Sequence, residues 1–269
     1  MSKLIYIVYR KRSSEFIKRD NAKLLSIGRN ILPDNIIPNP TRLIETEDSL
    51  CAIFNPVSTV KVLSSSVCLG YSPGNTWAEM SVSAGNLEGS FSIYRNDEAT
   101  FEVATEMVAS RTVWYYMDDE VLVTSSSQRA MVMYLGSFEF DRRVIPWMLS
   151  SGTLGPGFSY DKRFTLLAPN SLLTLNKSNW ILNKQVIKIE LTNSYSVKAD
   201  AQTALKQVIA GTFNKFDIDN DTFVLPLSGG YDSRGILLFL KNRANLKTIT
   251  WGTGDALTDR ENDAYVAKQ

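Results

Sequence analysis

The sequence predicts an α+β N-terminal domain followed by the start of an α/β domain with a parallel sheet. Short β-rich runs bounded by turn residues dominate the first part of the chain, whereas apolar residues recur at helical spacing from residue 197 onward. The last part then alternates helix, strand, helix, strand and helix, the order that generates parallel strands. We therefore predict two domains, residues 1–192 and 193–269.

The N-terminal domain is predicted to consist mainly of strands. Its β-rich runs are residues 4–9, 51–54, 67–71, 90–94, 172–175 and 185–189, with a polar turn at 176–179. Two further runs, 113–117 and 120–124, flank Asp118 and Asp119, which predicts a hairpin. A short helix is expected over residues 127–135.

The C-terminal domain is predicted to begin with an amphipathic helix over residues 197–216. The apolar residues of its stripe are Val197, Ala201, Leu205, Val208, Ile209, Phe213 and Phe216. An acidic loop at 217–221 then leads to an apolar strand at 223–227.

A glycine pair ends this strand, and a second helix and strand are predicted after it. The helix is expected over residues 233–242, with Ile236, Leu237, Phe239 and Leu240 buried. A strand at 246–251 follows, and then a helix that begins near Asp259. Two strands cannot make a covered parallel sheet, and the chain stops at Gln269 inside a helical pattern. We therefore expect the front part of a longer protein or a truncated product.

The composition excludes several kinds of chemistry. The chain contains no histidine, which excludes Ser-His-Asp and Cys-His catalysis and histidine-based zinc sites. Cys51 and Cys68 match no CxxC pattern, so two reduced thiols in a cytoplasmic protein are expected. The formal net charge of +1 and the lack of a long apolar run predict neither nucleic acid nor a membrane as a partner.

The segment that carries the chemistry is LSGGYDSR, residues 227–234, between an apolar strand and a helix. Such a turn directs backbone N–H groups at one point, where the helix dipole attracts anions. Glycines allow close approach of phosphate oxygens and positive φ angles, and Ser228 and Ser233 add hydroxyl donors. Asp232 beside a phosphate makes sense as a Mg²⁺ ligand. The alternative is a glycine-rich turn in which Asp232 or Ser233 caps the helix.

This segment, within FVLPLSGGYDSRGILLFL, resembles the ATP-pyrophosphatase loop of asparagine synthetases and their relatives, including β-lactam synthetase and lasso-peptide cyclases. Residues 89–94 are similar to the family's G-x-F strand, and residues 110–116 to its D-x-x-G-x-x-P-L-Y-Y element. Weaker similarities lie at 124–126, 154–157 and 167–171. The resemblance covers most of the chain and implies stacked antiparallel sheets in a glutaminase-like N-terminal domain, followed by an ATP-pyrophosphatase domain.

The resemblance implies an amide-forming ligase that activates a carboxylate as an acyl-adenylate and releases pyrophosphate from ATP. The implied cofactors are ATP and Mg²⁺, and the implied partners are a small-molecule or peptide carboxylate and an amine or ammonia donor; a homodimer stays open. The implied nucleotide-binding residues are Leu227, Ser228, Gly229, Gly230, Asp232, Ser233, Arg234, Trp251 and Gly252. The implied metal ligands are Asp232 and Asp263.

Some of these assignments have alternatives. Asp259, Glu261 and Asp263 compete as the second metal ligand, and together they also fit an acidic first helical turn. Arg234 fills a slot that is usually small, so it either contacts phosphate or a substrate carboxylate, or is an exposed first-turn residue.

The N-terminus departs from the family. Its glutaminases use an N-terminal cysteine, and here Ser2 stands in that place, within Ser-Lys-Leu rather than Cys-Gly-Ile. We expect a structural domain rather than an active glutaminase that uses Ser2 as nucleophile. β-Lactam synthetase shows the same departure, and there the amine comes from the substrate itself.

Three functional readings follow. The first is an asparagine synthetase-type ligase that serves asparagine biosynthesis. The second is a specialised amide-bond former that acts on a peptide, a metabolite or a surface sugar, which Arg234 and the absent N-terminal cysteine favour. The third is a degenerate or truncated protein that binds ATP or a partner without catalysis.

Overall fold

The computed structural model describes residues 2–11, 14–35, 37–72, 74–79, 87–190, 192, 194–215, 223–240 and 245–269. The chain divides into two compact units, Met1–Glu190 and Leu191–Gln269, a boundary two residues before the predicted one. Phe216, the predicted loop at 217–221 and the end of the predicted helix at 241–242 lie outside the described residues.

The first unit contains two antiparallel sheets. The first sheet has the strand order β10 (Thr165–Leu166), β8 (Trp114–Met117), β9 (Val121–Ser125), β1 (Lys3–Tyr9), β3 (Ser49–Phe54) and β2 (Arg42–Glu45). The second has the order β12 (Ile181–Val186), β11 (Ser171–Asn176), β7 (Thr100–Thr105), β6 (Ser90–Asn96), β5 (Ser66–Tyr71) and β4 (Val60–Leu63).

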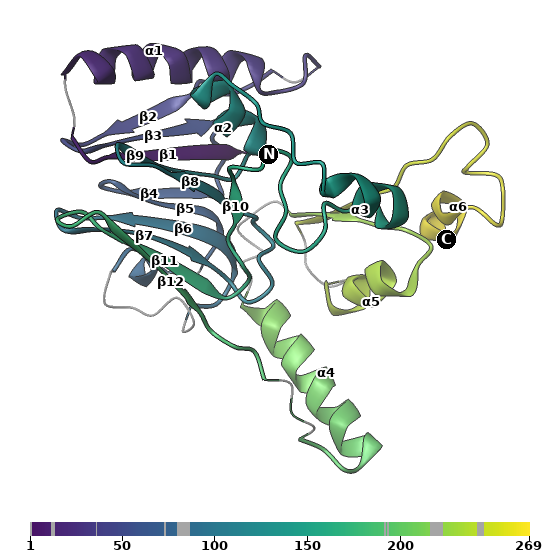
Figure 1. The fold of residues 1–269 in the computed structure, drawn as a ribbon. Helices are drawn as coiled ribbons and strands as arrows, with labels where there is room; N and C mark the ends of the chain where they lie inside the picture. The colour runs from purple at the N-terminus through teal and green to yellow at the C-terminus, as the bar shows by residue number, and fades with distance from the viewer. Residues whose placement is uncertain are drawn as a thin grey trace. The chain divides into compact units, whose positions relative to one another are not determined.

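The two sheets stack face to face, and their inner faces form the main core (Figure 1). Alternate residues of β1, among them Leu4 and Tyr6, point into this core and meet Phe101 of the second sheet. The intervening residues Ile5 and Ile7 point to the other face, where helices cover them. Burial on both faces explains why β1 is a continuous apolar run rather than an alternating pattern.

Helices cover the outer face of the first sheet (Figure 1). α1 (Ser14–Asn30) packs there through Leu24 and Ile27, and α2 (Gln128–Leu135) through Ala130 and Met131. The outer face of the second sheet packs against Trp77 in the short 3₁₀ helix η1 (Thr76–Ala78). A further helix, α3 (Val144–Ser151), is capped at its C-terminal end by Gly152.

Most strands predicted in this unit are confirmed, including the hairpin of β8 and β9, where Met117 pairs with Leu122. The predicted helix at 127–135 is α2, and Ser127 is its N-cap. The predicted strand at 185–189 is wrong in position, because residues 177–180 form a tight turn and β12 begins directly after it. The elements α1, α3, β2, β4, β7 and β10 were not predicted from the sequence.

The second unit contains a two-stranded parallel sheet and three helices. Its elements are α4 (Lys198–Asn214), β13 (Phe223–Pro226), α5 (Tyr231–Leu240), β14 (Leu246–Ile249) and α6 (Asp263–Lys268). β13 and β14 pair from Phe223 with Leu246 to Pro226 with Ile249. The predicted order of elements is therefore confirmed, although α5 begins two residues earlier than predicted and α6 begins at Asp263.

The burial predicted for α5 is confirmed only in part, and Ile236 and Leu237 are half-buried. No residue of α4 is buried, and Leu205 in its predicted apolar stripe is 59% exposed. In α5, Leu240 is buried, whereas Phe239 is 41% exposed. Phe213 of α4 stacks on Phe239 of α5, and much of both apolar stripes stays at the surface.

In the part of the chain that the structure describes, no helix combines the length and the apolar character needed to cross a membrane.

Candidate functional site

The site is built around the turn that joins β13 to α5. The Leu227 amide donates to the Ile249 carbonyl at 2.8 Å, which extends the parallel ladder one residue beyond β13. The chain then turns through Ser228, Gly229 and Gly230, and α5 starts at Tyr231. The first amides of a helix have no partner inside it, so this turn presents donors where the helix dipole is positive.

A pair of serines closes the turn. The hydroxyl oxygens of Ser228 and Ser233 lie 3.0 Å apart, and the Ser228 amide donates to the Ser233 hydroxyl at 3.1 Å. The Gly230 amide donates to the Ser228 hydroxyl at 3.2 Å. Ser233 therefore lies inside the first turn of α5 and ties it back to the end of β13. The alternative that Asp232 or Ser233 precedes the helix as its cap is wrong, since both lie within α5.

The two glycines of the turn serve close approach rather than a left-handed backbone. Neither Gly229 nor Gly230 has a positive φ, contrary to the prediction. A Cβ at residue 229 would instead lie 2.5 Å from Asp263 Oδ1 and 3.1 Å from Asp263 Cα. The start of α6 thus packs directly against the backbone of the turn, and a side chain at residue 229 would separate them.

A pocket of about 320 Å³ opens beside this turn. Its lining residues are Pro226, Leu227, Ser228, Thr250, Trp251 and Asp263. Three predicted nucleotide-binding residues, Leu227, Ser228 and Trp251, therefore meet there, together with the predicted metal ligand Asp263. Trp251 is 72% exposed, so much of its surface is open to solvent beside the pocket.

Gly252 lies just beyond the pocket and packs closely against the segment before α6. A Cβ at residue 252 would lie 2.2 Å from the Ala256 Cβ. Pro226 and Thr250 also line the pocket and were not predicted as site residues. Their positions in the sequence could have indicated this, because residues at the ends of neighbouring parallel strands meet at the same edge of a sheet.

Arg234 folds back over the turn. Its Nε donates to the Gly230 carbonyl at 3.2 Å, and its guanidinium lies 5.0 Å from the centre of the Tyr231 ring. The side chain is half-buried, not simply exposed as one of the two alternatives holds. Arg234 therefore holds a carbonyl of the turn through its Nε.

The acidic residues fall into two groups. Asp263 lines the pocket, and Asp232 is exposed in the first turn of α5. Asp259 and Glu261 lie in the turn before α6, where the Glu261 amide donates to Asp259 Oδ1 at 3.0 Å. Across the described residues, no three side chains of the metal-binding types gather at one point. Of the two predicted metal ligands, Asp263 therefore lines the pocket and Asp232 does not.

Ser2 occupies a different environment in the first unit. It is buried, its hydroxyl donates to the Asn55 carbonyl at 2.7 Å, and it accepts from the Val57 amide at 3.1 Å. Both contacts fix the hydroxyl as a structural bridge between β1 and the segment after β3. This arrangement fits the expectation of a structural role, because both contacts hold the hydroxyl in place.

Comparison with known proteins adds no family. No family model matches the sequence, and a search of curated proteins finds no match.

Proposed function

We propose that this chain is part of an ATP-dependent, amide-forming ligase of the asparagine synthetase type, in which the turn at residues 228–230 holds the pyrophosphate of ATP. The observation that carries the proposal is the closed turn itself. Ser228 and Ser233 are tied together at the N-terminal end of α5, and Gly229 lets Asp263 pack against the backbone of the turn. Hydroxyl and amide donors at a helix N-terminus after a parallel strand favour a phosphate ligand.

The neighbouring pocket supports a nucleotide rather than a simple anion. The exposed indole of Trp251 and the side chain of Leu227 offer apolar surface to a base, and Ser228 brings the phosphate-binding turn to the same pocket. Aromatic stacking of a base contributes about 1–3 kcal/mol. A ligand with a planar ring at one end and phosphates at the other satisfies both parts of the site.

Mg²⁺ is usually held by one or two protein carboxylates and completed by phosphate oxygens and water. Asp263, which lines the pocket, would hold it, with Asp232 of the first turn of α5 as the proposed second ligand. When bound, the ion would offset the negative charge that develops on the departing pyrophosphate.

The amine is proposed to come directly from a second substrate or from ammonia. The hydroxyl of Ser2 is fixed by Asn55 and Val57, which speaks against glutamine hydrolysis in the first unit. This favours a specialised amide-bond former acting on a peptide, metabolite or surface sugar over asparagine biosynthesis.

The experiment is a product assay with Mg·ATP, a panel of carboxylates and either ammonia or glutamine. We expect AMP and pyrophosphate as products, support by ammonia or an amine, and no support by glutamine. Formation of ADP and phosphate would contradict the proposal. Ser196→Ala, an exposed serine of the same unit, is the matched control for Ser233→Ala.

A further inference from the structure

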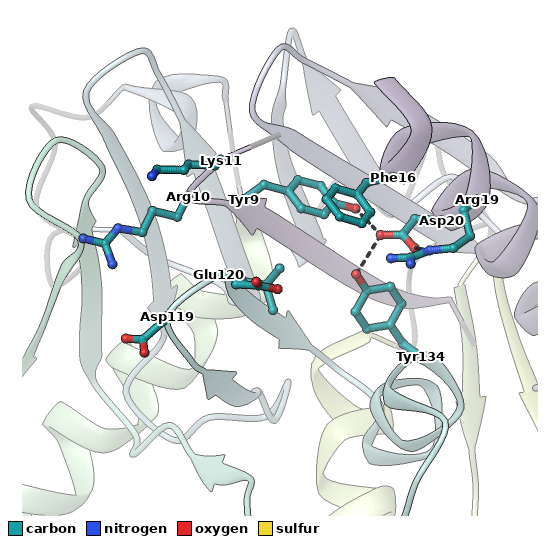
Figure 2. Close-up of a pocket in the computed structure, with 10 residues that line it drawn as sticks. Tyr9, Arg10, Lys11, Phe16, Arg19, Asp20, Asp119, Glu120 and Tyr134 are labelled. Carbon is teal, nitrogen blue, oxygen red and sulfur yellow. Dashed lines mark hydrogen bonds and ion pairs between the residues drawn. The ribbon is translucent and has the colours of Figure 1, made fainter. Parts of the chain in front are cut away.

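A second pocket lies wholly in the first unit, at the end of β1 and beside the first turns of α1 (Figure 2). Its volume is about 430 Å³, within the range of small-molecule sites. It is remote in sequence from the turn at residues 228–230, and none of the predicted site residues lines it. It therefore calls for a separate explanation.

One face of α1 forms a wall of this pocket. Phe16, Arg19 and Asp20 follow one another at helical spacing, so they lie on the same side of the helix. The carboxylate of Asp20 is only 2% exposed, and Asp20 Oδ2 accepts from the hydroxyls of Tyr9 at 2.7 Å and Tyr134 at 2.9 Å. Burial and the neighbouring carboxylate raise the pKa of both phenols, so they remain protonated donors.

The fixed carboxylate of Asp20 orients a guanidinium. Arg19 Nε donates to Asp20 Oδ1 at 3.3 Å, and the guanidinium lies 4.9 Å from the centre of the Phe16 ring. Arg19 itself is 66% exposed, and among the described residues its terminal nitrogens bind no acceptor. An arginine held through Nε and by a ring presents its two terminal nitrogens as a fork that matches a carboxylate.

Carboxylates approach from the other side of the pocket. Glu120 and Asp119 belong to the turn between β8 and β9, which Asp118 fixes by accepting from the Glu120 and Val121 amides at 2.8 Å each. Figure 2 shows the Glu120 side chain on the opposite side of the pocket from Arg19. In the described part of the chain, the Glu120 carboxylate has no cationic partner.

The charges around the pocket balance. Arg10, Lys11 and Arg19 carry positive charge, and Asp20, Asp119 and Glu120 carry negative charge. A simple anion would face the acidic turn, and a simple cation would face the arginines. A ligand that carries both charges a few bonds apart satisfies both sides, and the rings of Phe16 and Tyr9 offer surface to an apolar part.

We propose that this pocket binds a free α-amino acid, with its carboxylate on Arg19 and its ammonium group on Glu120. A purely structural role accounts for Asp20 and the two tyrosines, which fasten α1 to the sheet. It does not account for an oriented, exposed arginine that faces an unpaired glutamate across a cavity.

The test uses the full chain and the twenty common amino acids, screened by thermal shift and followed by calorimetry on the strongest binder. That amino acid is then compared with its decarboxylated amine and with its deaminated acid. We expect each analogue to bind at least tenfold more weakly. We also expect Arg19→Gln to weaken the binding of the amino acid and of the deaminated acid, but not the binding of the amine. Glu120→Gln should weaken the binding of the amino acid and of the amine, but not the binding of the deaminated acid.

The controls separate this site from the proposed nucleotide site. Arg142→Gln, at an exposed arginine outside the pocket, should bind like the parent chain, and so should Gly229→Ala. Circular dichroism checks that each variant is folded. The proposal is overturned if no amino acid binds, if the analogues bind as tightly as the amino acid, or if both pocket variants retain full affinity.

Discussion

The hydroxyl oxygens of Ser228 and Ser233 lie 3.0 Å apart across the turn between β13 and α5. This contact joins the end of a parallel strand to the first turn of a helix. Because Ser233 Oγ also accepts from the Ser228 amide, a single side chain sets the shape of the turn on which the proposed function depends.

Removing that side chain tests the turn directly. We predict that Ser233→Ala lowers the free energy of unfolding by about 1 kcal/mol, the usual net value of a lost hydrogen bond. Affinity for Mg·ATP should fall about tenfold, because the Ser228 amide and hydroxyl lose their partner. Calorimetry and thermal unfolding measure both effects, and Ser196→Ala should change neither. A Ser233→Ala variant with unchanged nucleotide affinity would remove the serine pair from the site.

Gly229→Ala tests the close packing of the turn on α6. The added Cβ would meet Asp263 Oδ1 at 2.5 Å, so Asp263 must move away from the pocket. We predict at least a tenfold loss of Mg·ATP affinity in calorimetry.

Gly211→Ala is its matched control. Gly211 lies inside α4 with open space around it, so alanine there should raise the free energy of unfolding by about 0.5–1 kcal/mol and leave nucleotide binding unchanged. Equal behaviour of the two variants in the binding assay would contradict the packing argument.

The stability of the first unit should fall at high pH. Burial raises the pKa of Tyr6, Tyr9, Tyr94 and Tyr134 above the ordinary value of about 10. Above pH 10 the unfolded chain therefore releases protons that the folded chain retains, and the free energy of unfolding falls by about 1.4 kcal/mol per pH unit for each such group. Below about pH 9 these groups contribute no pH dependence.

Urea unfolding between pH 8 and 11 measures this effect. Replacing both Tyr9 and Tyr134 with phenylalanine should make the decline above pH 10 shallower. A parent chain whose stability is level up to pH 11 would show that these phenols ionise inside the folded unit.

The two thiols should be inert in the folded chain. Burial raises the pKa of the Cys68 thiol to about 12 and also raises that of Cys51, so neither forms thiolate near neutral pH. We predict no alkylation by iodoacetamide at pH 8 until the chain unfolds, and then two modified residues by mass spectrometry. Rapid modification of the folded chain would show that this core opens.

The sequence predicted the elements with strong local signals. β1 is an uninterrupted apolar run, α2 begins after Ser127 and ends at Gly136, and the β8–β9 hairpin follows from Asp118, whose carboxylate accepts turn amides. In each case the local chemistry and the tertiary structure favour the same conformation.

The missed elements lack such signals. α1 is highly charged and contains Gly28, which a sequence analysis counts against a helix. Tertiary packing requires this glycine, because a Cβ at residue 28 would lie 2.0 Å from Thr41 Oγ1. β12 was misplaced because it is an edge strand, mostly exposed, so its residues show no clear alternation.

The candidate site was predicted in part. The strand, turn and helix that carry Ser228 and Ser233 follow from local pattern, and so does the place of Trp251 after β14. The contact of Asp263 with Gly229 joins residues far apart in sequence and could not be predicted from spacing. The pocket beside Asp20 joins β1, α1, α2 and the β8–β9 turn, and no motif marks it.

The most direct test of the central claim is a calorimetric titration of ATP into the full chain, with and without Mg²⁺, for the parent and for Asp263→Asn. We predict binding of ATP that requires Mg²⁺, is competed by pyrophosphate and falls at least tenfold in the variant. ATP binding that is indifferent to Mg²⁺, to pyrophosphate and to Asp263, or no binding at all, would contradict a pyrophosphate-binding turn at residues 228–230.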